Sequence, residues 1–390
     1  MFDLINYMLR FGYYYSLLMG LLNFEIDWRT GRAQITRRAS IYAAIVNGIS
    51  VYWLPRLCGT HVVASLWPQA KHLHEYLYLV MLGGRVLCVC VTLLTRWTHR
   101  QQFIHLVNAV QRLTQRKPHV KRLWRRGVIS KALSAFLLDV LQSGVLIQQI
   151  YENLTVQLIL IVLVVHILSV LVNIIIAHYY FSLLNIHAQY SLLNQELRSA
   201  LAEIRLLEFV QFVFAIKCCA LADQLETIAG TQSQLQELLQ TLTSSFGLQT
   251  VLLTISYYMM GVATIYLAFC ELTGAVLLDW NVCNLLLLSC QFVCYFTDIY
   301  ISVNIMYSLL DAHAEMLRLL SENTIFAPGL DERLAIVFNS FQLQLAWNPL
   351  KIPVLGLFNM EKSKSVALAS SVVTSSLVLI QNDFKNSYLY

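Results

Sequence analysis

The last long stretch of the chain with almost no charge, residues 365 to 384, carries polar side chains at helical spacing. On a helix with about 3.6 residues per turn, one stripe is formed by Thr374, Val378, Gln381, Asn382 and Lys385. A second stripe, at four-residue steps, is formed by Ala367, Ser371 and Ser375. Hydroxyls can bond to carbonyls of their own helix, whereas the amides of Gln381 and Asn382 need other partners or water. The first stripe therefore indicates a water-lined path or the outer membrane interface, and the second indicates a surface for close helix packing.

Three charged residues interrupt otherwise apolar stretches: Arg85, Asp139 and Asp298. A charge at bilayer depth costs at least about 2.5 to 3.5 kcal/mol, so each of them should face the helix bundle and find a partner. Arg85 and Asp139 fall at matching depth in consecutive predicted spans. This predicts an intramembrane charge pair between them, which would either fix helix packing or take part in ligand binding or gating.

Aromatic and polar side chains gather in the outer halves and the middles of the predicted spans. The candidate ligand contacts are Tyr52, Trp53, Gln142, His166, Tyr257, Tyr258 and Tyr266, with Phe269 beside them. An aromatic cavity with a few polar groups is typical of a site for a small, mainly apolar ligand. Aromatic residues in membrane helices also serve as packing residues or interface anchors. Both interpretations stay open for each of these residues.

Motifs of enzymes are absent from the sequence. The 10 histidines show no H-E-x-x-H spacing, no Gly-rich phosphate loop follows a strand, and no G-x-S-x-G occurs. We therefore expect no enzymatic activity, no metal and no cofactor. The missing histidine ligands also argue against a seven-span zinc hydrolase.

Composition places these residues in a membrane. Of the 390 residues, 57% are hydrophobic and only 13% are charged, whereas soluble domains have about 25% charged residues. Windows long enough to cross about 30 Å of hydrocarbon lie at about 39–57, 76–97, 131–150, 156–181, 247–270, 281–306 and 365–384. A Tyr-rich stretch at 11–24 is too short for a span and suits an interfacial helix. The sequence predicts an all-α polytopic membrane protein with seven transmembrane helices.

Lysine and arginine are distributed unevenly between the two sets of loops. One set, residues 1–38, 96–131, 183–246 and 309–364, holds 5, 10, 3 and 5 of the 27 basic residues. By the positive-inside rule the N-terminus is cytoplasmic, and seven spans then place the C-terminus outside. The net charge of +5 comes mostly from these predicted cytoplasmic loops. A nucleic-acid partner is not needed to explain it. The basic run at 115–126 suits contact with anionic lipid headgroups, and a specific regulatory lipid site is the alternative.

The cytoplasmic connections are long and have helical periodicity. Residues 183–246 repeat leucine and isoleucine at helical spacing without a proline, which predicts extensions of the fourth and fifth spans. Asp331 is a plausible N-cap for a helix through about Ala346. The chain therefore divides into five parts: 1–182 with spans one to four and the ligand pocket, 183–246, 247–308 with spans five and six, 309–364, and 365–384.

Two features of the outer loops are open. Cys58, Cys270 and Cys283 lie near the outer ends of spans, so one extracellular disulfide among them is an option. Asn153 begins the only glycosylation sequon on a predicted outer loop, but that loop is so short that its use is an open question.

The chain resembles the insect gustatory receptors. Their last span carries the signature T-Y-x5-Q-F, and this sequence has Thr374, Ser375 in place of Tyr, five residues, Gln381, and Asn382 in place of Phe. The similarity extends over essentially the whole chain. It includes LLNFEIDW at 21–28, KPHVK at 117–121, KCCALAD at 217–223 and QLQLAWNPLKI at 342–352, which look like stretches of fly receptors usually associated with bitter or aversive stimuli.

The resemblance implies a ligand-gated, nonselective cation channel of four subunits in the plasma membrane of a sensory neuron. The last span of each subunit would line the pore, the cytoplasmic helices would form an intersubunit anchor, and tastants would enter a pocket among the earlier spans. The family's apolar constriction maps to Val378 and Asn382, with Gln381 beside them. Because Asn382 is an amide, the resemblance allows a leaky homomer, a gate resting mainly on Val378, or a subunit that works only in heteromers.

Two other functions remain to be compared with this one. A G-protein-coupled receptor also has seven spans, but it requires the opposite orientation. A non-conducting accessory subunit of a heteromeric receptor would share the fold and the orientation.

The topology can be tested with epitope tags. Because 23 of the 27 basic residues lie in one set of loops, we expect a C-terminal tag to bind antibody on unpermeabilised cells. An N-terminal tag should bind only after permeabilisation. A C-terminal tag that is reached only after permeabilisation would contradict this topology.

Overall fold

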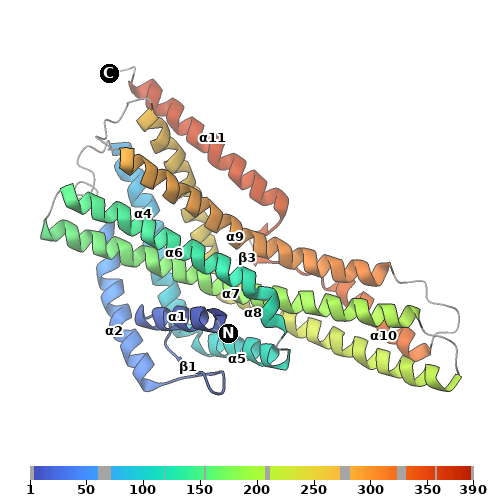
Figure 1. Cartoon of the computed structure of the whole chain (residues 1–390). Helices are drawn as coiled ribbons and strands as arrows, with labels where there is room; N and C mark the ends of the chain where they lie inside the picture. Colours follow the sequence, from blue (N-terminus) through green and yellow to red (C-terminus); the bar gives the residue numbers. More distant parts are fainter. Residues whose placement is uncertain are drawn as a thin grey trace.

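The computed structural model describes residues 4–59, 72–117, 119–152, 155–206, 211–272, 282–322, 331–355 and 358–387. Within these ranges the chain is built of α-helices with two small β-hairpins (Figure 1). This agrees with the all-α class expected from the composition.

The N-terminal part places a short helix and a hairpin before the first long helix. Helix α1 (Leu4–Leu18) is followed by the antiparallel strands β1 (Glu25–Asp27) and β2 (Arg32–Gln34). The turn between the strands suits Gly31, whose φ of 70° lies in the left-handed region. Helix α2 (Arg37–Trp53) is capped by Thr36, whose hydroxyl accepts a hydrogen bond from the Ala39 amide, and it continues into the 3-10 helix η1 (Leu54–Cys58).

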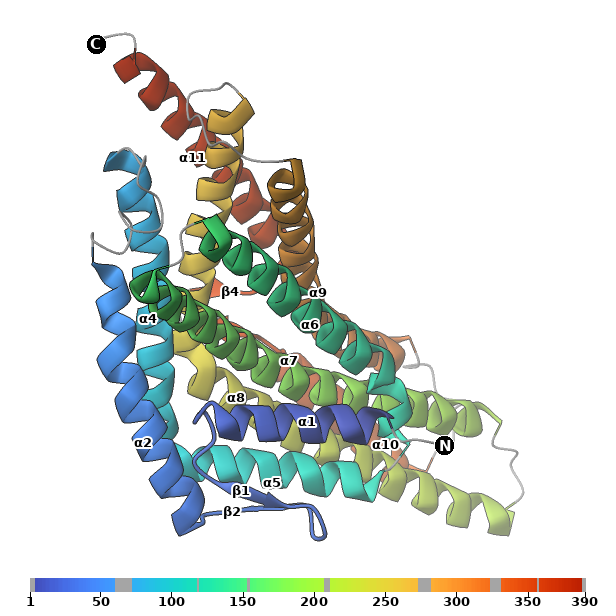
Figure 2. The same ribbon diagram turned by 60° about the vertical axis from the view of Figure 1, so that its left-hand side comes forward.

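The next three helices follow one another closely along the chain. Helix α4 (His72–Thr98) is followed almost at once by α5 (Arg100–Arg116), and α6 (Val120–Glu152) follows α5. In Figure 2, α1 and α5 lie nearly parallel and cross the lower part of the molecule. Helix α5 therefore occupies the end of the molecule where the sequence predicts cytoplasm.

Two helices are far longer than a bilayer requires. Helix α7 (Val156–Arg205) has 50 residues and α8 (Gln211–Leu272) has 62, so at 1.5 Å per residue they measure about 75 and 93 Å. Residues 183–205 and 211–246 thus continue the helices of the fourth and fifth predicted spans. In both views the two helices run side by side to the far corner of the molecule (Figures 1 and 2).

The C-terminal part returns the chain along this scaffold. Helix α9 (Val282–Ser321) packs against α6 and α7, and α10 (Glu332–Trp347) packs against α8 and α9. The side chain of Asp331 caps α10 by accepting from the amides of Arg333 and Leu334, as the sequence predicts. The strands β3 (Pro353–Val354) and β4 (Phe358–Asn359) then lead into α11 (Lys362–Ser387), which packs on α8.

The buried apolar residues form two clusters. The larger runs through the long arms of α7 and α8 and includes Leu197, Leu225 and Phe338. The smaller lies between α4, α7 and neighbouring helices and includes Val89 and Ile175. The apolar faces of the predicted cytoplasmic extensions are therefore buried within this one chain to a large extent.

Five described helices are long and apolar enough to cross a membrane: α4, α7, α8, α9 and α11. The other two predicted spans coincide with α2, which has 17 residues, and α6, which has 33. The count of seven spans and the orientation of the termini remain predictions. Cys58 is a free thiol, while Asn153 and the side chains of Cys270 and Cys283 lie outside the described part of the chain.

A buried ion pair joins α6 to α9. Lys131 Nζ lies 2.7 Å from each carboxylate oxygen of Asp298, and the two side chains are 1% and 6% exposed. The hydroxyls of Ser134 and Ser302 complete the cluster, since Ser134 donates to Asp298 and Lys131 donates to Ser302. The partner of Asp298 is thus Lys131, at the edge of the third predicted span. Because both side chains are buried, breaking this ion pair should destabilise the protein more than breaking an exposed pair.

Replacing Lys131 by Met should leave the Asp298 carboxylate buried without its cation and destabilise the protein by about 3 to 5 kcal/mol. The double variant Lys131→Met, Asp298→Leu should recover much of that loss, because both charges are gone. Thermal unfolding of the purified protein measures both effects. Lys117→Met is the matched control, since the Lys117–Glu196 pair is 28% and 32% exposed and should matter little. A double variant less stable than Lys131→Met would contradict this view of the pair.

Candidate functional site

Helix α11 packs on α8 along one face only. Ser376 is fully buried, and its hydroxyl bonds to the carbonyl of Val372 at 2.7 Å. Val372 faces Gly261 of α8, where an added Cβ would lie 3.0 Å from the Val372 side chain. The missing side chain at Gly261 therefore allows the two helices to approach closely.

Tyrosine hydroxyls tie the borders of this face to the neighbouring helices. Tyr258 of α8 bonds to the hydroxyls of Ser371 at 3.1 Å and Ser375 at 2.7 Å. Near the C-terminal end of α11, the buried Tyr266 bonds to Asp383 at 3.0 Å. At its start, the Tyr307 hydroxyl of α9 bonds to Ser365. Ser371 and Ser375, predicted as packing residues, thus contact α8 through Tyr258, while Ala367 stays exposed.

The opposite face of α11 is exposed over its whole length. It carries the predicted stripe Thr374, Val378, Gln381 and Asn382, all of them exposed. Thr374 donates to the carbonyl of Ser370 at 3.0 Å. Within the described part of the chain, the amides of Gln381 and Asn382 make no hydrogen bond. In Figure 1 this helix stands at the edge of the molecule, beside α8 and α9 and away from α1, α2 and α5.

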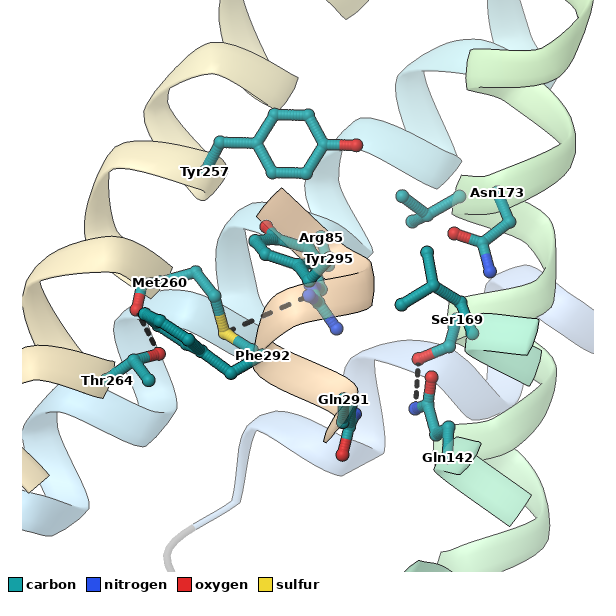
Figure 3. Close-up of a pocket in the computed structure, with 12 residues that line it drawn as sticks. Arg85, Gln142, Ser169, Asn173, Tyr257, Met260, Thr264, Gln291, Phe292 and Tyr295 are labelled. Carbon is teal, nitrogen blue, oxygen red and sulfur yellow. Dashed lines mark hydrogen bonds between the residues drawn. The ribbon is translucent and has the colours of Figure 1, made fainter. Parts of the chain in front are cut away.

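A cavity of about 100 Å³ lies between α4, α6, α7, α8 and α9 (Figure 3). Its lining residues are Arg85, Leu138, Gln142, Ser169, Val172, Asn173, Tyr257, Met260, Thr264, Gln291, Phe292 and Tyr295. The Gln142 amide donates a hydrogen bond to the Ser169 hydroxyl at 2.6 Å. The rings of Tyr257 and Tyr295 pack edge to face, with their centroids 5.3 Å apart. The wall therefore combines aromatic rings with amide, hydroxyl and guanidinium groups.

The predicted pair of Arg85 and Asp139 does not form. Asp139 accepts a hydrogen bond from Asn173 at 2.7 Å, and Arg85 lies beside the sulfur of Met260 at 4.0 Å and near Tyr295. The prediction was wrong because Asn173 of α7 satisfies Asp139 from another side, so depth alone did not decide the partner. Arg85 instead faces the cavity.

The structure separates the predicted ligand contacts into groups. Gln142 and Tyr257 line the cavity, together with Arg85. Tyr258 and Tyr266 contact α11 instead. The remaining three lie elsewhere: Tyr52 and Trp53 are exposed under the guanidinium of Arg56, and His166 is close to Asp139.

Several lining residues were missed by the sequence analysis, among them Ser169, Asn173, Gln291 and Tyr295. Their signal was available, since Asn173 and Gln291 are amides inside otherwise apolar stretches and such groups need internal partners. No group of three metal-ligating side chains occurs among the residues whose placement is described.

Known proteins are similar to this chain over nearly its whole length. The sequence profile of the family described as 7tm Chemosensory receptor matches residues 9–386. Gustatory receptor 59d of Drosophila melanogaster is 37% identical over 396 aligned residues, with 99% of this chain and 100% of the relative covered. Gustatory receptor 36a of the same fly is 34% identical over 390 residues, again with 99% and 100% covered.

The fold is also similar to a solved receptor. The insect olfactory receptor OR5 from Machilis hrabei in complex with eugenol superimposes with a TM-score of 0.61 at 12% identity, covering 96% of this chain and 98% of that one. The same receptor described without eugenol gives a TM-score of 0.61 at 13% identity. The helical architecture, the match over nearly the whole sequence and the identity to fly receptors lead to one conclusion: this chain belongs to the insect gustatory receptors of the seven-transmembrane chemosensory receptor family.

Proposed function

We propose that this chemosensory receptor is one subunit of a ligand-gated, nonselective cation channel whose pore is lined by α11. The observation that supports the proposal most is the exposed stripe of α11, with the amides of Gln381 and Asn382 free of partners within the described chain. Polar amides are costly in hydrocarbon, so this face needs water or protein against it. A water-filled axis among several copies of the chain supplies both.

The exposure of α11 supports an assembly around that helix. Of the five candidate spans, α11 is the least buried within the chain. Four copies around one axis, the number that the family resemblance implies, would turn the Thr374 to Asn382 stripe inward. The face with Ser376 would keep its contact with α8. Each subunit would then contribute one wall of the pore.

Val378 is the residue that we propose as the main gate. It is apolar and 59% exposed on the stripe, so a ring of four such side chains could exclude water when closed. Asn382 lies one turn farther out, and an amide ring there would stay wet. A leaky homomer, or a subunit that closes fully only in a heteromer, is the corresponding expectation.

The cytoplasmic helices are proposed to form the intersubunit anchor. Helix α10 exposes Ile336, Leu343 and Trp347 at spacings of seven and four residues, which places them on one face. Trp347 is 81% exposed. A large apolar face on a helix outside the bilayer is suited to burial against a second copy of the chain.

The cavity behind α8 is proposed as the site for a small-molecule tastant. It combines aromatic walls with a few polar groups, as ligand sites do. Resemblance to fly receptors associated with aversive stimuli supports a bitter or aversive tastant. The olfactory receptor of similar fold is described in complex with eugenol, and a small organic ligand is the corresponding expectation for this chain.

The plasma membrane of a sensory neuron, with the N-terminus inside, is the proposed location. At the inner surface, the exposed Lys121, Arg122, Arg125 and Arg126 flank the buried Trp124. Four exposed cations on one short segment suit anionic lipid headgroups.

Val378→Ala should raise the current in the absence of ligand and change the ion permeability ratios, because it widens and weakens the apolar ring. The receptor would be expressed alone and with other gustatory receptor subunits, and currents recorded under ion substitution. Val373→Ala is the matched control. Val373 is 49% exposed on another side of the same helix and should leave both properties unchanged. Equal effects of the two substitutions would remove Val378 from the pore.

A further inference from the structure

Arg85 is a cation in the membrane-spanning part of α4 without an acidic partner. Its side chain is half-buried, and its guanidinium lies 4.0 Å from the Met260 sulfur and close to the Tyr295 hydroxyl. Across the described ranges of the chain, no carboxylate lies within ion-pair distance of it. Arginine stays charged at all physiological pH values. The described chain therefore supplies no counter-charge to this half-buried cation, although a charge at membrane depth needs one.

The acidic residues that could have served are already engaged. Asp139 accepts from Asn173 at 2.7 Å. Asp298 is held by Lys131 at 2.7 Å and by Ser134. Both carboxylates are thus held by side chains of other helices. Neither is available to pair with the guanidinium of Arg85.

The guanidinium points into the cavity. In Figure 3 it lies at the centre of the lining residues, between Tyr295 and the pair of Gln142 and Ser169. Tyr257 and Gln291 border the same space. A molecule in this cavity would therefore meet two guanidinium nitrogens, with amide and hydroxyl groups beside them.

The size of the cavity restricts what can enter. Its volume is about 100 Å³, whereas an apolar cavity of about 150 Å³ accommodates benzene. A short-chain acid of about two to five carbons matches the space. A carboxylate also matches the guanidinium, which binds such groups through two parallel hydrogen bonds.

We propose that this cavity binds a short-chain carboxylate through Arg85, which makes the tastant class small organic acids in their anionic form. The proposal rests on the proposed function in one respect, namely that this cavity is the tastant site. The charge of Arg85 selects the carboxylate, and the walls formed by Tyr257, Phe292 and Tyr295 enclose the alkyl chain. A neutral molecule of the same shape would leave the charge unpaired.

The test compares acids with their isosteric amides. Acetate, propionate and butyrate would be titrated against the purified full chain, each beside acetamide, propionamide or butyramide, at neutral pH. The rise in unfolding temperature with concentration gives the affinity, because a ligand of the folded state stabilises it. We expect at least one acid to bind about 10 to 100 times more tightly than its amide, the range for a hydrogen-bonded charged group.

Substitutions of Arg85 then test whether this residue causes the preference for the acid over the amide. In Arg85→Gln the acid and the amide should bind alike, and Arg85→Lys should keep part of the preference because it keeps the charge. Leu87→Ala is the control. Leu87 is 53% exposed two positions along the same helix, and its replacement should leave the preference unchanged. If Arg85→Gln does not fold, wild type and Arg85→Lys still decide the proposal.

Several results would overturn it. Equal binding of acid and amide by the wild type, or an unchanged preference in Arg85→Gln, would remove Arg85 from recognition. Stabilisation by chloride equal to that by every acid would show a general anion site instead. The channel is tested separately: binding of acids without any current would refute the channel and keep this site. Currents to other compounds without acid binding would refute this site and keep the channel.

Discussion

Polar groups that lie in a bilayer must be satisfied within protein or by enclosed water, and α11 meets this condition on one face only. On its packed face, Ser376 bonds to a carbonyl of its own helix, and Tyr258 of α8 bonds to Ser375. The close approach at Gly261 brings the two helices together there. Its other face presents Gln381 and Asn382 with no partner in the described chain. The helix stands at the edge of the fold (Figure 1), where the proposed assembly of subunits would cover this face.

Helix α8 connects the two candidate sites. Tyr257 lines the cavity, and the next residue, Tyr258, bonds to Ser371 and Ser375 of α11. Adjacent residues on one helix point about 100° apart, so α8 can contact both sites at the same level. A ligand that moved α8 would therefore act directly on the helix proposed to line the pore. The Lys131–Asp298 pair holds α6 and α9, which also border the cavity, in a fixed relation.

Helix content and continuity could be predicted from the sequence, but the pairing of polar groups could not. Periodic apolar residues predicted the extended α7 and α8, and the cap at Asp331 predicted α10 almost to the residue. The Arg85–Asp139 pair was wrong, because the rotation of each helix brings Asn173 to Asp139 and turns Arg85 to the cavity. Spacing along one helix defines a face, whereas the partner of that face depends on how several helices cross. Lys131 was overlooked for another reason: it is the first residue of a predicted span and was counted with the cytoplasmic loop.

The central claim, that α11 lines a water-filled pore with one face, is tested most directly by cysteine accessibility along that helix. Single cysteines at 372, 374, 376, 378, 381 and 382 would be exposed to a small, charged thiol reagent while current is recorded. We expect cysteines at positions 374, 378, 381 and 382 to react and change the current, and those at 372 and 376, which face α8, to stay unreactive. Reaction at 372 and 376 with none along the exposed stripe would contradict it.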